Sequence, residues 1–158
     1  MKDREVIKIL NDMKGRGHSQ YSLYAIDRAI EAIEKTIDKV KITERGWAGH
    51  FIMANKCRFR RNTLLEYKDK KVVVSSVGLM EGLDGKGFEP IGAFDRYYET
   101  MCWYADLNDT RYYDIDVERQ ISLNGQWYIN KIDADDKANV MHDNAVEEIK
   151  ARLMSGEL

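Results

Sequence analysis

The stretch from Trp47 to Leu123 constrains the fold most, because short runs of β-branched and aromatic residues alternate there with turn signals. Such runs predict strands. Short connections, such as the one at Lys68-Asp69-Lys70, imply that neighbouring strands are antiparallel. Asp84-Gly85 with Gly87 fits a hairpin loop, and Asn108-Asp109 gives a similar signal. We expect strands near residues 47–54, 57–67, 71–79, 88–94, 97–107, 112–117 and 118–123.

Helical patterns lie on both sides of this stretch. Residues 3–13 repeat apolar side chains at helical spacing, and a second apolar stripe runs from Leu23 to Val40 after Ser22, the predicted N-cap. The second stripe is under three heptads long, which favours a helix lying on a sheet over a coiled coil. A third stripe, over 138–153, follows acidic residues that suit a helix start and precedes Gly156, a typical helix stop.

Together these patterns predict an α+β fold. We expect an antiparallel meander of about five to seven strands over roughly 47–123, with two N-terminal helices and one C-terminal helix packed mainly on one face. Successive strands without helices between them argue against a doubly wound sheet. The chain has 158 residues, and a single domain over 1–158 is the natural expectation at this length.

Composition excludes several classes of protein. Hydrophobic residues make up 44% of the chain and there is one proline, which argues against disorder and against Pro-rich or collagen-like structures. No apolar run approaches the ~18 residues that a membrane span needs, and the N-terminus lacks an apolar signal region. Two cysteines do not make a disulfide framework. We therefore expect a cytoplasmic protein that touches no membrane and is a monomer or a homodimer.

The densest basic run is Arg58-Phe59-Arg60-Arg61. Together with Lys56 and Trp47, these arginines could contact nucleic-acid phosphates and stack on bases. The net charge of -2 argues against a strong nucleic-acid binder. The structural alternative is a set of cross-strand ion pairs between these arginines and the acidic segment 114–118.

That acidic segment is also a candidate contact surface. Asp114, Asp116 and Glu118 alternate with apolar residues, which places the three carboxylates on one face of a strand. Protein interfaces combine aromatic anchors with a charged rim. The predicted partner-binding residues are Trp103, Tyr104, Tyr112, Tyr113, Asp114, Asp116 and Glu118.

Histidine and cysteine residues suggest a metal site. His50 and Cys57 flank a predicted turn and would face each other across a hairpin. A zinc site needs three or four ligands, and Cys102 and His142 could complete one. The candidate ligands are His50, Cys57 and His142, and a structural zinc is the only cofactor expected. The alternatives are buried side chains that serve packing or make a satisfied hydrogen bond, or a metal-dependent hydrolase around the same three residues.

Several runs resemble a family of small proteins from phages and mobile elements. They include Arg45-Gly46-Trp47-Ala48-Gly49-His50-Phe51, Cys57-Arg58-Phe59-Arg60-Arg61-Asn62-Thr63-Leu64-Leu65 and Arg96-Tyr97-Tyr98-Glu99-Thr100-Met101. The resemblance covers about residues 45–153. The family has a cysteine where Met53 stands here, which leaves its His-x2-Cys-x3-Cys pattern one ligand short.

Small accessory proteins of this origin are often non-enzymatic inhibitors of host defence, including anti-CRISPR proteins. The resemblance therefore implies a non-catalytic binding protein that blocks a host CRISPR effector nuclease, or its DNA loading, in the host cytoplasm. Two alternatives stay open from the residues. One is a nucleic-acid-binding module built on Lys56–Arg61, and the other is the hydrolase around His50, Cys57 and His142.

Overall fold

The computed structural model describes residues 3–16, 19–37, 39–47, 50–82 and 84–158. The chain forms two compact units, Met1–Lys39 and Val40–Leu158. The expectation of a single domain over 1–158 stays a prediction, because two compact units can belong to one domain. Among the described helices, none is both long enough and apolar enough to cross a membrane.

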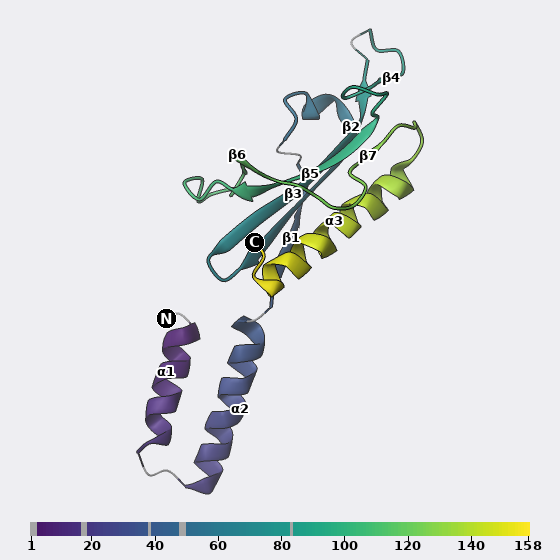
Figure 1. Cartoon of the computed structure of the whole chain (residues 1–158). Helices are drawn as coiled ribbons and strands as arrows, with labels where there is room; N and C mark the ends of the chain where they lie inside the picture. The colour runs from purple at the N-terminus through teal and green to yellow at the C-terminus, as the bar shows by residue number, and fades with distance from the viewer. Residues whose placement is uncertain (1–2, 17–18, 38, 48–49, 83) are drawn as a thin grey trace. The chain divides into compact units, whose positions relative to one another are not determined.

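The smaller unit is a pair of packed helices, α1 (Asp3–Lys14) and α2 (Gln20–Ile37) (Figure 1). Lys14 and Asp27 form an ion pair between them. Ser19 takes the capping place predicted for Ser22, since the Ser19 Oγ accepts a hydrogen bond from the Ser22 backbone N–H at 3.3 Å. The apolar spacing therefore predicted both helices correctly, although α2 ends before Val40.

The larger unit contains a seven-stranded antiparallel sheet (Figure 1). The main path through the sheet has the order β1-β2-β3-β5-β6, with β4 paired to β3 and β7 paired to β5. The strands are β1 (Lys41–Arg45), β2 (Cys57–Tyr67), β3 (Lys70–Glu81), β4 (Phe88–Glu89), β5 (Tyr98–Ala105), β6 (Ile115–Ile121) and β7 (Tyr128–Ile129).

The tight turns of the meander lie where the sequence predicts them. Tyr67 pairs with Lys70 across a two-residue turn. In the loop between β3 and β4, Gly85 and Gly87 adopt φ values of 71° and 72°, a region that glycine enters without steric cost. The first turn joins β2 to β3 and the second joins β3 to β4, and each joined pair is antiparallel.

Some predicted strands differ from the structure. The strand predicted at 47–54 is wrong: its described part from Phe51 on consists of turns leading into the 3₁₀ helix η1 (Ala54–Lys56), and 48–49 lie outside the described residues. The predicted strands 112–117 and 118–123 are one strand, β6, and the predicted strand 88–94 shortens to β4. The strand β1 was not predicted, and it begins directly after Val40, where the apolar stripe of the second predicted helix ends.

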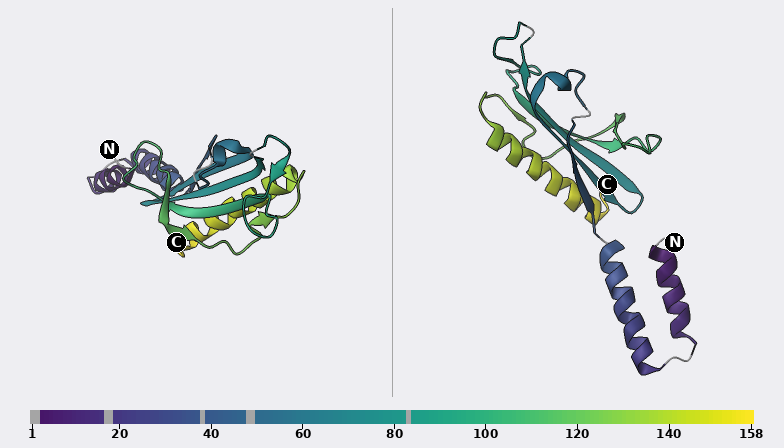
Figure 2. Two further views of the ribbon diagram at one scale, coloured as in Figure 1. Left: turned by 90° about the horizontal axis from the view of Figure 1, so that it is seen from above. Right: turned by 180° about the vertical axis from the view of Figure 1, so that it is seen from behind.

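Both faces of the sheet are covered by residues of the larger unit. Helix α3 (Asp135–Ser155) packs on one face, where Val72 and Val74 meet Ile149 and Leu153. The opposite face, which carries Val73 and Val77, is covered in part by residues 50–56, here called the covering segment (Figure 2). The α+β class with three helices is therefore confirmed, and the packing of α1 and α2 on the sheet stays a prediction.

Candidate binding surface and the buried polar layers beside it

Three aromatic side chains gather at one end of the sheet. Phe94 is 88% exposed, while Trp127 and Tyr128 are 37% and 38% exposed with their ring centroids 5.0 Å apart, edge to face. Together with Ala93 and Arg96, they line a pocket of about 270 Å³. The set formed by Phe94, Arg96, Trp127 and Tyr128 is called the aromatic end.

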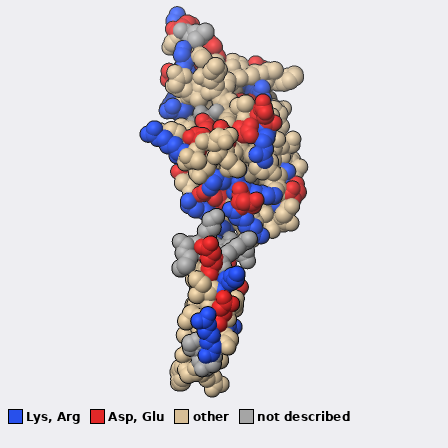
Figure 3. All heavy atoms as spheres, turned by 90° about the vertical axis from the view of Figure 1, so that its left-hand side faces the viewer, with Lys and Arg blue, Asp and Glu red and all other residues tan. Residues whose placement is uncertain are grey.

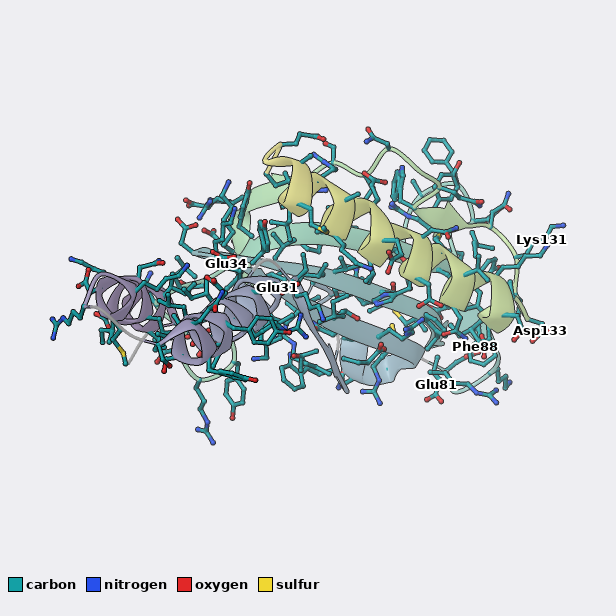
Figure 4. All side chains as sticks on the ribbon, turned by 90° about the horizontal axis from the view of Figure 1, so that it is seen from below. Glu31, Glu34, Glu81, Phe88, Lys131 and Asp133 are labelled. Carbon is teal, nitrogen blue, oxygen red and sulfur yellow. The ribbon has the colours of Figure 1, made fainter. Side chains whose placement is uncertain are left out.

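Charged residues of both signs border this end of the unit. Figure 4 shows Glu81, Phe88, Lys131 and Asp133 gathered where α3 begins. The loop that carries Phe94 leaves the sheet at the same end, because β4 pairs with Met80 and Glu81 at the end of β3. This end of the unit therefore carries charged residues of both signs, as the rims of protein interfaces do.

The backbone that presents Phe94 is strained. Phe94 and Asp95 have φ values of 63° and 51°, which bulky non-glycine residues rarely adopt. The turn is closed by the Ile91 backbone N–H, which donates to the Arg96 carbonyl oxygen at 2.7 Å. Residues held in such conformations persist only where the surrounding structure fixes them, and they cluster at functional sites.

Trp127 is held on the sheet by its backbone. The Thr100 backbone N–H donates to the Trp127 carbonyl oxygen at 2.7 Å. The Arg96 guanidinium lies 5.1 Å from the centroid of the Trp127 ring and its Nη1 lies 3.0 Å from the Glu99 Oε2. Arg96 therefore links the aromatic end to a buried acid of the sheet.

A buried polar layer joins the covering segment to the sheet. The His50 Nδ1 lies 2.7 Å from the Ser75 Oγ, and the His50 Nε2 lies 3.3 Å from the Glu99 Oε1. The His50 ring also stacks on Trp103 with centroids 5.1 Å apart. Serine, histidine and glutamate are the residue types of a hydrolase triad, but Ser75 is fully buried in the middle of β3, where a substrate does not reach its hydroxyl.

A second polar layer lies under α3. The His142 Nε2 is 2.8 Å from the Thr63 Oγ1, and its Nδ1 is 2.7 Å from the Ser76 Oγ, which in turn is 2.6 Å from the Thr100 Oγ1. Burial lowers the pKa of His142 to about 4, and the charge of Arg61 acts in the same direction. His142 is therefore neutral at pH 7 and serves as a hydrogen-bond hub across three strands.

The structure does not bring the three predicted metal ligands together. His50 and His142 lie on opposite faces of the sheet, on Ser75 and Ser76 respectively. The Cys57 thiol donates a weak hydrogen bond to the Met53 carbonyl oxygen at 3.8 Å, and burial raises its pKa to about 11. In the described ranges, no group of three or more His, Cys, Asp or Glu side chains is arranged to hold a metal ion. Zinc stays a prediction without this ligand set.

The predicted basic strand is only partly free. Arg58 and Arg60 are exposed on β2, but the Arg61 guanidinium lies 2.8 Å from Glu44 and 2.8 Å from Asp143. Lys56 is half-buried at the end of η1. The predicted cross-strand ion pairs with 114–118 are wrong, because β3 and β5 separate β2 from β6.

The predicted partner-binding residues are also split by the fold. Trp103 is only 6% exposed, which removes it from the surface. Tyr104 and Tyr113 are half-buried, and each is covered by a cation: Arg119 lies 4.2 Å from the Tyr104 centroid and Lys71 lies 4.3 Å from the Tyr113 centroid. These residues therefore offer a partner less area than the sequence suggests.

The rest of the predicted surface is more open. Tyr112 is 47% exposed and packs edge to face on Trp47, with centroids 6.0 Å apart. Asp114 and Asp116 are half-buried, and Glu118 is exposed. Phe94, Trp127 and Tyr128 were not predicted from the sequence. A bulky aromatic residue two positions after a glycine in a turn-rich stretch is a signal that could have identified Phe94 and Trp127.

On the face shown in Figure 3, Lys and Arg are interspersed with Asp and Glu over the described part of the larger unit. No protein-family model, no curated protein and no solved structure matches the chain. The geometry of the aromatic end is therefore the basis for assigning a function.

Proposed function

We propose that the protein is a non-catalytic binding protein that holds another protein against its aromatic end. The observation that carries this proposal is Phe94, a bulky residue held at φ 63° with 88% of its surface exposed. The strained backbone and the exposed ring both lower the stability of the isolated protein, and packing of the Phe94 side chain offsets neither cost. An aromatic anchor buried by a partner gives the arrangement a use, because hot spots of interfaces are enriched in aromatic residues and arginine.

Electrostatics favours a protein partner over a nucleic acid. The chain has a net charge of -2, and positive and negative side chains are mixed on the face in Figure 3. Arg96, the cation of the aromatic end, is already paired with Glu99. A nucleic acid would need several unpaired cations along its backbone. A protein surface with an apolar recess for Phe94 needs none.

The family resemblance supplies the first partner to test. We propose a CRISPR effector nuclease of the host, which the protein blocks directly or prevents from loading DNA. The burial of Ser75 supports a non-catalytic role, because the triad-like residues around it are closed to substrate. Inhibition by occlusion needs a rigid anchor and no chemistry.

The experiment combines binding with a nuclease assay. The wild-type protein is expected to co-purify with the effector and to protect its target DNA. Phe94→Ala and Trp127→Ala are each expected to weaken binding by at least ~30-fold, the effect of a hot spot of about 2 kcal/mol. Ile52→Ala removes a 97% exposed side chain elsewhere and serves as the matched control. Normal binding by both aromatic-end variants would refute the assigned surface.

Tyr112→Ala distinguishes the aromatic end from the surface predicted by sequence. Its effect should be small if Phe94 is the anchor. If Tyr112→Ala abolishes binding while Phe94→Ala does not, the contact surface lies on the Trp47–Tyr112 side. If no host effector binds the wild-type protein, the inhibitor form of the proposal is wrong.

A second candidate function rests on Arg58 and Arg60. Both are exposed and lie on the same face of β2, on either side of the buried Phe59. Neither forms an ion pair with a described residue. They are therefore available to nucleic-acid phosphates. An Arg58→Gln, Arg60→Gln double variant should lower retention on DNA and flatten its salt dependence. Wild-type binding that does not change with salt would exclude this function.

A further inference from the structure

Glu99 on β5 is the one Asp, Glu, Lys or Arg residue that is buried in the part of the chain that the structure describes. Its neighbours across the strands are Val77 on β3 and Tyr128 on β7. Taking a carboxylate out of water costs free energy unless its oxygens are bonded to other groups. The contacts of the two carboxylate oxygens therefore indicate what the buried acid does.

The two oxygens of Glu99 contact two different parts of the chain. The Oε1 lies 3.3 Å from the His50 Nε2 of the covering segment, and the Oε2 lies 3.0 Å from the Arg96 Nη1. The Arg96 guanidinium in turn lies 5.1 Å from the centroid of the Trp127 ring. The sheet thus holds Arg96 through Glu99, and Arg96 contacts the exposed indole of the aromatic end.

A glycine leaves room for Arg96 in this position. Gly92 and Arg96 form an isolated antiparallel bridge, and a Cβ at position 92 would lie 2.6 Å from the Arg96 Nε and 2.7 Å from its Cζ. The guanidinium therefore lies against the backbone of the turn that carries Phe94, where any side chain at position 92 would displace it. Arg96 touches the turn, the buried acid and the Trp127 ring at once.

We propose that Glu99 is the positioning residue of the aromatic end, because it holds Arg96 against Trp127 before a partner binds. Its effect on binding rests on the proposed function, whereas its effect on Trp127 exists in the free protein. A contact surface that is already ordered loses less conformational entropy on association. A Glu99 that served His50 alone would leave the surroundings of Trp127 unchanged when it is replaced.

The first test uses fluorine NMR of the free, full-length protein labelled with fluorotryptophan. The chain has three tryptophans, so three resonances are expected, each assigned by a Trp→Phe variant. Glu99→Gln and Arg96→Met should each shift the Trp127 resonance and leave that of Trp47, which packs on Tyr112 instead. In the Arg96→Met background, Glu99→Gln should cause no further shift of Trp127, because the acid acts through the arginine. An unmoved Trp127 resonance in Glu99→Gln, or the same shift in both backgrounds, overturns the proposal.

Gly92→Ala provides a second test that leaves the buried acid in place. The added methyl group should push the Arg96 guanidinium away from its site without removing a charge, and the Trp127 resonance should shift as it does in Arg96→Met. Gly46→Ala is the matched control, since nothing lies within 4 Å of a Cβ added there. A Trp127 resonance that stays in place in Gly92→Ala would show that Arg96 does not set the surroundings of the ring.

Binding assays with the host effector separate this inference from the proposed function. Glu99→Gln and Gly92→Ala should each weaken binding roughly 5-fold, the effect of losing one cation–π contact. If the resonances shift as expected but the effector binds no form of the protein, the proposed function fails and the positioning role of Glu99 stands. If Phe94→Ala loses binding while both variants bind like the wild type, the aromatic end is the contact surface and Glu99 does not position it.

Discussion

Lowering the pH from 7 to 4 is expected to destabilise the larger unit through His142. The folded protein holds this pKa at about 4, because the imidazole is buried, against an ordinary value of 6.5 in the unfolded chain. Above pH 6.5 the side chain is neutral in both states and contributes no pH dependence. Between pH 6.5 and 4 the unfolded chain binds a proton that the folded protein excludes, so stability falls as the pH falls.

The magnitude follows from the gap between the two pKa values. A gap of about 2.5, at 1.36 kcal/mol per pH unit, amounts to about 3 kcal/mol of lost stability at pH 4. The loss levels off below pH 4, where the folded protein is protonated as well. Other groups also contribute on acidification. The cation of Arg61 lowers the pKa of Glu44, and the pKa of Glu66 is lowered because, although burial raises it, Lys41 and Lys71 together outweigh burial.

A His142→Gln variant isolates the contribution of the histidine. Urea unfolding followed by tryptophan fluorescence gives the free energy of unfolding of each protein between pH 7 and pH 4. At pH 7 the wild type should be the more stable, because glutamine does not satisfy both Thr63 and Ser76 as well. The advantage should shrink by about 3 kcal/mol by pH 4. A difference between the two proteins that stays constant with pH would refute a neutral, buried His142.

Three other changes test the packing. Phe94→Asn should raise the free energy of unfolding by up to about 1 kcal/mol in urea titrations, because asparagine tolerates positive φ. The same variant should weaken partner binding. A lower free energy of unfolding would show that the backbone at Phe94 is not strained. Gly78→Ala should cost about 3 kcal/mol in the same assay, since the new Cβ would lie 2.8 Å from the Tyr98 Cγ, and a neutral effect would show that the ring can move. Cys57 and Cys102, both buried with raised thiol pKa values, should react with a thiol reagent at pH 8 only after unfolding, and rapid native labelling would show that they are exposed.

The parts of the fold that local sequence marks are the parts that could be predicted. The bounds of β2 follow from a β-rich run that a turn at Lys68-Asp69 ends. Apolar residues continue in helical spacing from α2 to Val40, yet Lys41–Arg45 forms a strand that pairs with β2. The spacing of apolar residues along the chain does not reveal such long-range pairing. The covering segment contains apolar residues such as Phe51 and Ala54 because it closes a face of the sheet, and composition does not distinguish such a loop from a strand.

The candidate site was harder to predict than the fold for the same reason. Trp103 and Tyr104 alternate on β5, and only the covering segment decides that Trp103 is buried against His50. His142 has the residue type of a metal ligand, but its surroundings supply two hydroxyl groups. Phe94 is exposed because of a backbone turn, which side-chain periodicity does not reveal.

The hydrogen bonds of His142 have a consequence for how the chain folds. Its two nitrogens bind Thr63 on β2 and Ser76 on β3, and the latter binds Thr100 on β5. If any of these strands slipped by one residue, its hydroxyl would turn to the wrong side and leave a polar atom stranded in a dry interior. The imidazole thus favours the native strand register, because a misregistered sheet would be less stable and would unfold more readily.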